Sequence, residues 1–229
     1  MTAPGQYLHV LALAIEPAWR ARPDAERAAD LADLVTADAH AMSHEVVSLS
    51  YTSVGLEPGV DLLLWRTGPA IDALESAAAA LLASRLGPWL RVSHAFLGRF
   101  NASQYSRAPT DQESGVTADG HGRYLVVYPF TKSSAWYLLS REARQGIMNE
   151  HMRVGRGYPM VRQALAYAFG LDDQDFVVAY ETDDLAAFGD LVRELRGTES
   201  RRSTVSDTPI LVGVRRPLHG LAAHLGVRA

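Results

Sequence analysis

The chain contains no cysteine. This absence excludes disulfide bonds, zinc–thiolate sites, iron–sulfur clusters and thiol nucleophiles together. Only one of the 22 basic residues is a lysine, Lys132, and the net charge is −4, so we expect no nucleic-acid partner. No apolar run is long enough to span a bilayer, and residues 1–6 lack the pattern of a signal peptide. We therefore expect a cytoplasmic protein without a membrane span.

The single lysine ends the segment Tyr128-Pro-Phe-Thr-Lys132, which continues a strand-like apolar run that begins at Tyr124. An arginine-rich composition is typical of a GC-rich genome, and a lone lysine within it is either an accident or a chemical requirement. A compact ammonium on a flexible stem has properties that a planar guanidinium does not always replace. Beside a tyrosine, this lysine predicts a site that holds a carboxylate substituent near an oxidisable phenol.

The order of segment types repeats once along the chain, at an offset of about 115 residues, although the identity between the halves is low. Each half is predicted to run strand, helix, strand, strand, helix, strand. The paired segments are residues 7–12 with 124–129, residues 51–56 with 166–171, and residues 61–67 with 175–182.

The helices of the second half have clear boundaries in the sequence. Ser140 is a suitable N-cap for a helix that reaches Val154, and Gly197 is a natural stop for a helix over residues 185–195. The matching helices of the first half are expected at residues 25–35 and 70–82. Strands of the second half are expected at residues 124–128, 161–167, 176–181 and 210–214, and a short docking helix at residues 218–225.

This order is the split β-α-β pattern of the ferredoxin-like motif, present twice. We predict an α+β fold in which tandem ferredoxin-like repeats form a dimeric α+β barrel-like fold, because two such sheets cover each other's open faces. Residues 1–100 form the N-terminal half and residues 123–229 the C-terminal half. Residues 101–122 are polar and glycine-containing, so they are predicted to be a linker or lid.

One histidine is a candidate ligand. His151 falls on the apolar stripe of the helix that begins after Ser140, so it is expected to point inward. It is either a core histidine bonded to a backbone carbonyl or a haem ligand whose second nitrogen needs a carboxylate or carbonyl partner. Glu199 is a candidate for that carboxylate. His40 and His44 stand four residues apart, but no third ligand follows at a suitable distance.

An ordered set of segments in the second half resembles the chlorite dismutase-like superfamily of haem proteins. No one segment is specific, but together they cover most of residues 124–213 at consistent spacing, and the first half matches only as a degenerate copy of the fold. The segments are residues 128–132, 136–144, 148–151, 155–159, 170–173 and 196–199.

The resemblance implies a haem site in the C-terminal half and none in the N-terminal half. It implies that His151 is the proximal iron ligand, that Glu199 is its carboxylate partner, and that Gln163 is at the distal position. Members that degrade chlorite have an arginine there, and many coproheme decarboxylases have a glutamine. A register change of one residue would instead place Arg162 over the iron. One branch also has a distal histidine ahead of the tyrosine strand; the corresponding region of this chain has Asp111 and Glu113, with His121 closer to the strand, and none of them is assigned that role.

The resemblance further implies that Tyr128 is the tyrosine that forms a radical in the decarboxylases and that Lys132 assists with the propionate. Trp136 falls beside the haem pocket, and Arg196 near a propionate. The implied reaction is peroxide-dependent decarboxylation of two propionates of iron coproporphyrin III, which is both substrate and cofactor, to give haem b. The alternatives are a chlorite dismutase-like or peroxidase-like haem enzyme, or a non-catalytic haem-binding protein. Members usually assemble as rings, so we expect a homo-oligomer, with a pentamer as the implied form.

Overall fold

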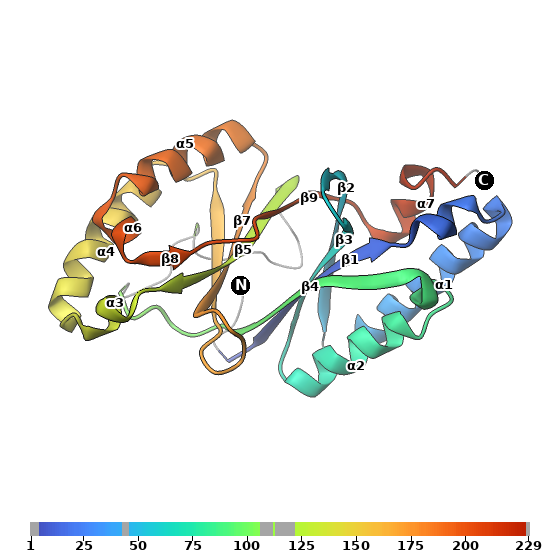
Figure 1. Ribbon diagram of the computed structural model, residues 1–229, viewed down its shortest axis with the longest axis horizontal. Coiled ribbons are helices and arrows are strands. Elements are labelled where there is room, and N and C mark those ends of the chain that lie inside the picture. Colours follow the sequence, from blue (N-terminus) through green and yellow to red (C-terminus); the bar gives the residue numbers. More distant parts are fainter. Residues whose placement is uncertain (1–4, 43–45, 106–111, 113–121, 228–229) are drawn as a thin grey trace. The chain divides into compact units, whose positions relative to one another are not determined.

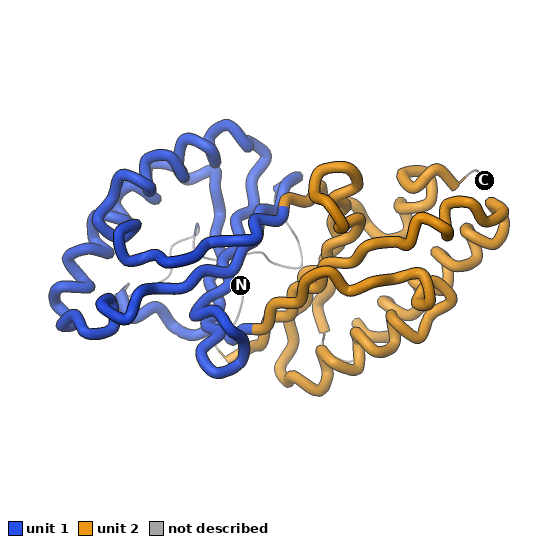
Figure 2. Tube along the Cα trace, in the orientation of Figure 1, with its two compact units in different colours: residues 1–4, 98–211 blue, residues 5–97, 212–229 orange. Residues whose placement is uncertain are grey.

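The computed structural model describes residues 5–42, 46–105, 112 and 122–227. They divide into two compact units, which Figure 2 colours separately. Unit 2 comprises Gly5–Leu97 and Val212–Ala229, and unit 1 contains Gly98–Leu211. The segment from Val212 onward thus belongs to the same unit as Gly5–Leu97.

Unit 2 is an antiparallel sheet with two long helices packed on one face (Figure 1). Its strand order is β4-β1-β3-β2-β9. Alternate residues of β1, among them Leu11 and Leu13, join Leu31 and Leu34 of α1 in the main core, as the two-residue period of a strand requires. The elements are β1 (Tyr7–Ile15), α1 (Asp24–Met42), β2 (Val47–Glu57), β3 (Val60–Gly68), α2 (Ile71–Leu82), β4 (Leu90–Arg99) and β9 (Leu211–Arg215), with short 3-10 turns at Pro17–Ala21 and Gly87–Trp89.

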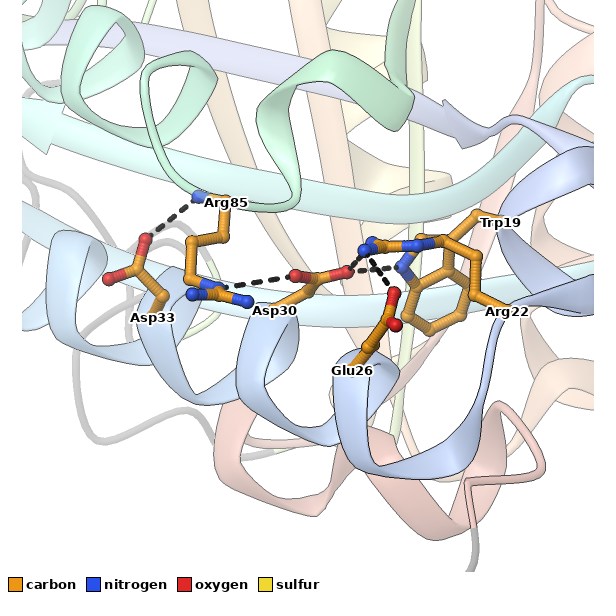
Figure 3. A network of polar contacts seen from close by, with 6 residues as sticks. All are labelled: Trp19, Arg22, Glu26, Asp30, Asp33 and Arg85. Atoms are coloured by element: carbon orange, nitrogen blue, oxygen red, sulfur yellow. Dashed lines mark hydrogen bonds and ion pairs between the residues drawn. The ribbon is translucent and has the colours of Figure 1, made fainter.

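A polar network closes the start of α1 (Figure 3). The Asp30 carboxylate is buried and accepts hydrogen bonds from the indole N–H of Trp19, at 3.0 Å, and from Arg22 and Arg85. The Arg22 guanidinium also bonds Glu26. Because the buried carboxylate has three donors around it, this cluster is fully satisfied, and its role is to hold the helix to its neighbouring loops.

Unit 1 repeats the same plan. Its strand order is β8-β5-β7-β6, which corresponds to β4-β1-β3-β2 of unit 2. Val178 and Tyr180 of β7 pack with Leu191 of α5 in the core of this unit. The elements are β5 (Tyr124–Lys132), α3 (Ser134–Leu138), α4 (Arg141–Gly155), β6 (Arg162–Tyr167), β7 (Phe176–Thr182), α5 (Leu185–Arg196), α6 (Glu199–Arg202) and β8 (Thr204–Ser206). The predicted α+β class is confirmed.

Several predicted boundaries are confirmed at atomic detail. The Ser140 hydroxyl accepts a hydrogen bond from the backbone N–H of Ala143 at 3.2 Å, so it is the N-cap of α4. Gly197 is the C-cap of α5. Gly170, with a φ of 70°, makes the turn between β6 and β7, a backbone conformation that suits glycine. Helix α1 is longer than predicted, and the short helices α3 and α6 were not predicted.

The C-terminal segment docks in the core of unit 2. It forms a 3-10 turn at Leu218–Gly220 and the short helix α7 (Leu221–His224). Leu218, Leu221 and Leu225 are buried in the core of unit 2 beside α1. None of the helices among the described residues combines the length and the apolar character needed to cross a membrane. Most of the predicted linker, residues 106–111 and 113–121, lies outside the described residues.

Candidate active site

A pocket lies within unit 1 between its helices and the helix-facing side of its sheet. It encloses about 490 Å³ of space not filled by atoms, part of which is open solvent. The lining includes His151 and Met152 of α4, Gln163 of β6, Tyr180 of β7, and Leu191 and Leu195 of α5.

His151 points into this unit from α4, as its place on the apolar stripe predicts. Its Nδ1 atom is buried and has no hydrogen-bond partner among the described residues. Burial, and to a smaller extent the positive charge of Lys132, lower the pKa of His151 to about 4. The imidazole is therefore neutral at physiological pH, which is the form that binds a metal. A buried nitrogen without a partner is uncommon in folded proteins and suggests that a group has yet to bind.

The register of β6 against β7 decides which of two adjacent side chains faces the pocket. Gln163 lies opposite Tyr180, and Arg162 lies opposite Glu181. Directly paired residues share a face of the sheet, and neighbours along a strand point to opposite faces. Gln163 and Tyr180 both line the pocket, so Arg162 is on the other face. The neutral amide, and not the guanidinium, shares the pocket with His151.

Tyr128 lies on β5, with Phe130 and Lys132 on the same face of the strand. Phe130 and Tyr128 pack against the core cluster of unit 1. The ring of Tyr128 is 6.0 Å from that of Tyr180, measured between centroids. Burial raises the pKa of Tyr128, and the nearby phenol of Tyr180 raises it further. Both phenols are thus neutral, and the sequence had indicated only Tyr128.

Lys132 is held at the end of β5 by uncharged partners. Its ammonium donates hydrogen bonds to the carbonyl and hydroxyl oxygens of Ser200, at 2.9 and 3.1 Å, and to the Thr204 hydroxyl at 3.1 Å. It also lies 4.8 Å from the ring centroid of Trp136, which is buried on α3. Burial and the nearby charge of Arg201 lower the pKa of Lys132 to about 8. No carboxylate among the described residues forms a salt bridge with this ammonium.

Further charges gather at the same end of the unit. Arg201 pairs with Asp207 at 2.7 Å, and Arg196 lies 3.8 Å from the same carboxylate. These two arginines and Lys132 make a cationic corner suited to the carboxylates of a ligand. The Glu199 carboxylate forms no hydrogen bond with the Nδ1 atom of His151. It pairs instead with Arg202 at 3.2 Å, and the backbone N–H of Glu199 donates to the Glu150 carboxylate.

These residues fit a metalloporphyrin. The imidazole is neutral, its pocket is lined in part by leucine and methionine, and the basic side chains at the end of the unit supply positive charge for acidic substituents of a ring. Haem sites are built from the same parts: one neutral axial histidine, an apolar cleft and partners for the propionates. No group of three or more His, Cys, Asp or Glu in the described part of the chain is placed to hold a metal ion.

Two residues of the pocket were missed by sequence reasoning. Tyr180 sits in a continuous apolar strand that gave no functional signal. Gln112 lines the pocket, and its amide donates to the carbonyls of Gly155, Tyr158 and Val161 at 2.9–3.0 Å, which closes the turn after α4. Asp111 and His44 lie outside the described residues. His40 is exposed.

Comparison with known proteins gives one family. Residues 24–216 match the chlorite dismutase family model. A coproheme decarboxylase from Mycolicibacterium smegmatis is 33% identical over 186 residues, 79% of this chain and 78% of the relative. A chlorite dismutase from Ideonella dechloratans is 28% identical, covering 99% of this chain and 82% of the relative. The crystal structure of a mutant chlorite dismutase from Candidatus Nitrospira defluvii has a TM-score of 0.89 at 25% identity, covering 98% of this chain and 97% of that one.

Proposed function

The chain belongs to the chlorite dismutase family, and within it we propose that the protein is a coproheme decarboxylase. The reaction would convert iron coproporphyrin III into haem b by removing two propionate carboxyl groups at the expense of hydrogen peroxide. The observation that carries the proposal is the placement of Tyr128 and Lys132 on one face of β5, beside a pocket that contains the neutral His151 and Gln163.

Each residue has a role that its surroundings support. His151 would bind the iron through a neutral imidazole, and Trp136 would form part of the wall beside Lys132. Lys132 and Arg196 would hold propionates, since Arg196 is a cation near Tyr128 and Lys132 lies further along the same face of β5. Glu199 would have to leave Arg202 to pair with His151. Bound iron porphyrin with peroxide supplies an oxidant strong enough to take an electron from a phenol.

The chain then has to guide the hydrogen atom and the carboxylate. A Tyr128 radical takes a hydrogen atom from the propionate carbon next to the ring. Loss of a second electron and of carbon dioxide leaves a vinyl group. Each propionate gives up two electrons, which one peroxide accepts as it becomes two molecules of water, with one proton taken up. Lys132 positions the carboxylate that leaves, because its ammonium can follow the group on a flexible stem.

Gln163 favours this reaction over chlorite degradation. An amide over the iron stabilises developing negative charge less than a guanidinium does, and Arg162 is on the opposite face of the sheet. Chlorite turnover nevertheless remains the second candidate, because a chlorite dismutase aligns with 99% of this chain.

The deciding experiment loads the purified protein with iron coproporphyrin III, adds peroxide stepwise and follows the porphyrin by mass spectrometry. We expect two successive losses, each of one carbon dioxide and two hydrogen atoms. Tyr128→Phe should stop both losses and keep the Soret band, and His151→Ala should lose the Soret band. Oxygen release from chlorite without any change of the porphyrin would replace the proposal by the second candidate. Binding with neither reaction would reduce the protein to a haem-binding module.

We further propose that the protein acts in the cytoplasm as a homo-oligomer, with a pentamer as the expected form. Light scattering of the purified protein measures the number of subunits in the assembly directly. A monomer of 24.9 kDa as the only species would contradict the proposed assembly.

A further inference from the structure

We propose that Ser200 and Thr204 are positioning residues for Lys132: their oxygens hold its ammonium in one place without cancelling its charge, so that the charge meets a carboxylate of the ligand. The inference rests on the proposed function for the role of Lys132 itself. It adds two hydroxyl residues, one on α6 and one on β8, that no motif of the sequence indicates.

The fold brings both hydroxyl residues to the end of β5. Strand β8 pairs with β5, and Thr204 lies directly opposite Lys132 in that pairing. Directly opposite residues share a face of the sheet, with Cβ atoms about 5 Å apart. Ser200 lies on α6, shortly before β8, and is 4% exposed. The lysine side chain is therefore approached from a strand and from a helix.

The number of acceptors around the ammonium matches the number of its donors. An ammonium has three N–H groups. They reach the Ser200 carbonyl oxygen at 2.9 Å, the Ser200 Oγ at 3.1 Å and the Thr204 Oγ1 at 3.1 Å. The centroid of the Trp136 ring lies 4.8 Å from the same nitrogen, within the range of a cation–π contact. Three hydrogen bonds and one ring together define the position of the ammonium.

The hydroxyl of Ser200 is itself oriented. It donates its proton to the sulfur of Met148 on α4, at 3.9 Å, which leaves the lone pairs of the oxygen for Lys132. At the other end of the lysine, the backbone N–H donates to the Asp175 carboxylate at 2.7 Å. Because both ends of the residue are held, the stem between them has few conformations open to it.

The acceptors matter because they are uncharged. The two other cations at this end of the unit, Arg196 and Arg201, share the carboxylate of Asp207. A ligand carboxylate that binds either arginine competes with this aspartate, whereas at Lys132 it competes with hydroxyl and carbonyl oxygens. Ser200 and Thr204 thus order the ammonium and leave its attraction for a carboxylate intact.

The contact can be tested in the ligand-free protein, because the chain has a single lysine. Lysine labelled with ¹⁵N at Nζ gives one ammonium signal, which is visible only where hydrogen bonds slow the exchange of its protons with water. Thr204→Val and Ser200→Ala each remove one acceptor oxygen, and each should shift and broaden the signal. Thr204→Ser keeps the hydroxyl and should keep the signal. The matched control is Ser206→Ala, which removes an exposed hydroxyl from the same strand.

The same signal reports the arrival of a ligand carboxylate. Metal-free coproporphyrin III carries the ring carboxylates without a paramagnetic iron, and adding it should move the ammonium signal of the wild type and of Ser206→Ala. The movement should be smaller in Thr204→Val and Ser200→Ala, because the ammonium meets the carboxylate in a smaller fraction of molecules. Thr204→Ser should restore it.

The role in the reaction is tested in the loaded enzyme. Thr204→Val should retain its affinity for iron coproporphyrin III and release carbon dioxide about tenfold more slowly, the effect of one hydrogen bond to a charged group. Thr204→Ser should recover most of that rate. An ammonium signal that is the same in Thr204→Val and Ser200→Ala as in the wild type, or an unchanged rate in Thr204→Val, would overturn the inference. If the wild type binds the porphyrin but releases no carbon dioxide, the proposed function fails. The inference is then decided by whether the ammonium signal moves with the ligand in the wild type and moves less in the two variants.

Discussion

The state of Lys132 makes a quantitative prediction for ligand binding. Its pKa is about 8 in the free protein, against an ordinary 10.5, because burial and Arg201 disfavour the charge. Its three donors are already used on Ser200 and Thr204, whose oxygens are uncharged. A carboxylate that replaces one of these acceptors supplies the missing negative charge and raises the pKa. Binding of an acidic porphyrin above pH 8 must then take up a proton.

The size of the effect follows from the two pKa values. If the carboxylate restores the ordinary value, the difference of 10.5 − 8 = 2.5 units weakens binding by up to roughly 300-fold between pH 8 and 10.5. The sign is fixed, because the free protein loses the proton first, and affinity falls as pH rises through 8. His151, Tyr128 and Tyr180 do not titrate between pH 8 and 10.5. The pKa of His151 is about 4, and the pKa values of the two tyrosines are raised.

The assay is fluorescence titration with metal-free coproporphyrin III at several pH values, since a metal-free ring avoids ionisation of water on iron. Lys132→Arg should bind tightly at all pH values up to 10, because a guanidinium does not titrate there. Lys132→Met should bind weakly with no slope. Arg201→Gln should move the inflection to higher pH. An affinity of the wild type that is flat between pH 8 and 10, or a slope that persists in Lys132→Met, would refute the reasoning.

Three further predictions concern separate parts of the molecule. In the ligand-free protein, NMR titration should show His151 neutral at pH 6, and Lys132→Met should raise the pKa of His151, because that cation lowers it. Asp38→Asn should destabilise the protein by about 3 kcal/mol in denaturant unfolding, since it leaves the buried Arg66 without its carboxylate; Asp190→Asn, on an exposed pair, should cost less than about 0.5 kcal/mol. Gln163→Arg should increase oxygen release from chlorite, measured with an oxygen electrode, and no increase would mean that the distal side chain does not control this choice.

Local signals in the sequence were sufficient for most of the fold. Ser140 and Gly197 mark the ends of α4 and α5 in the sequence, because capping depends on residues within one turn of the helix end. The inward direction of His151 follows from helical spacing alone. The same reasoning could not choose between Arg162 and Gln163, because the choice depends on the register of β6 against β7, which is set by long-range packing.

The missed residues have the same physical origin. Tyr180 is one aromatic side chain in a buried strand, and strands of this kind are apolar throughout, so its hydroxyl gives no local signal. Gln112 acts on carbonyls 43 to 49 residues away in the chain. Glu199 pairs with Arg202, three residues later on the same helix. This ion pair competes with the contact to His151 that the resemblance implied.

The same strand position carries different residues in the two units, and only the residue in unit 1 lines a pocket. Arg66 has the same place in unit 2 as Tyr180 in unit 1: it is opposite His9 on β1 and opposite Ser48 on β2. Its guanidinium is fully buried and pairs with Asp38 of α1 at 2.7 Å. The ion pair joins the helix to the sheet across the space that a flat ligand would need. Removing either partner would leave the other charge buried and unpaired. In unit 1 the corresponding helix presents a neutral imidazole with a free nitrogen, and the sheet presents a phenol and an amide. We therefore expect one porphyrin per chain, bound in unit 1.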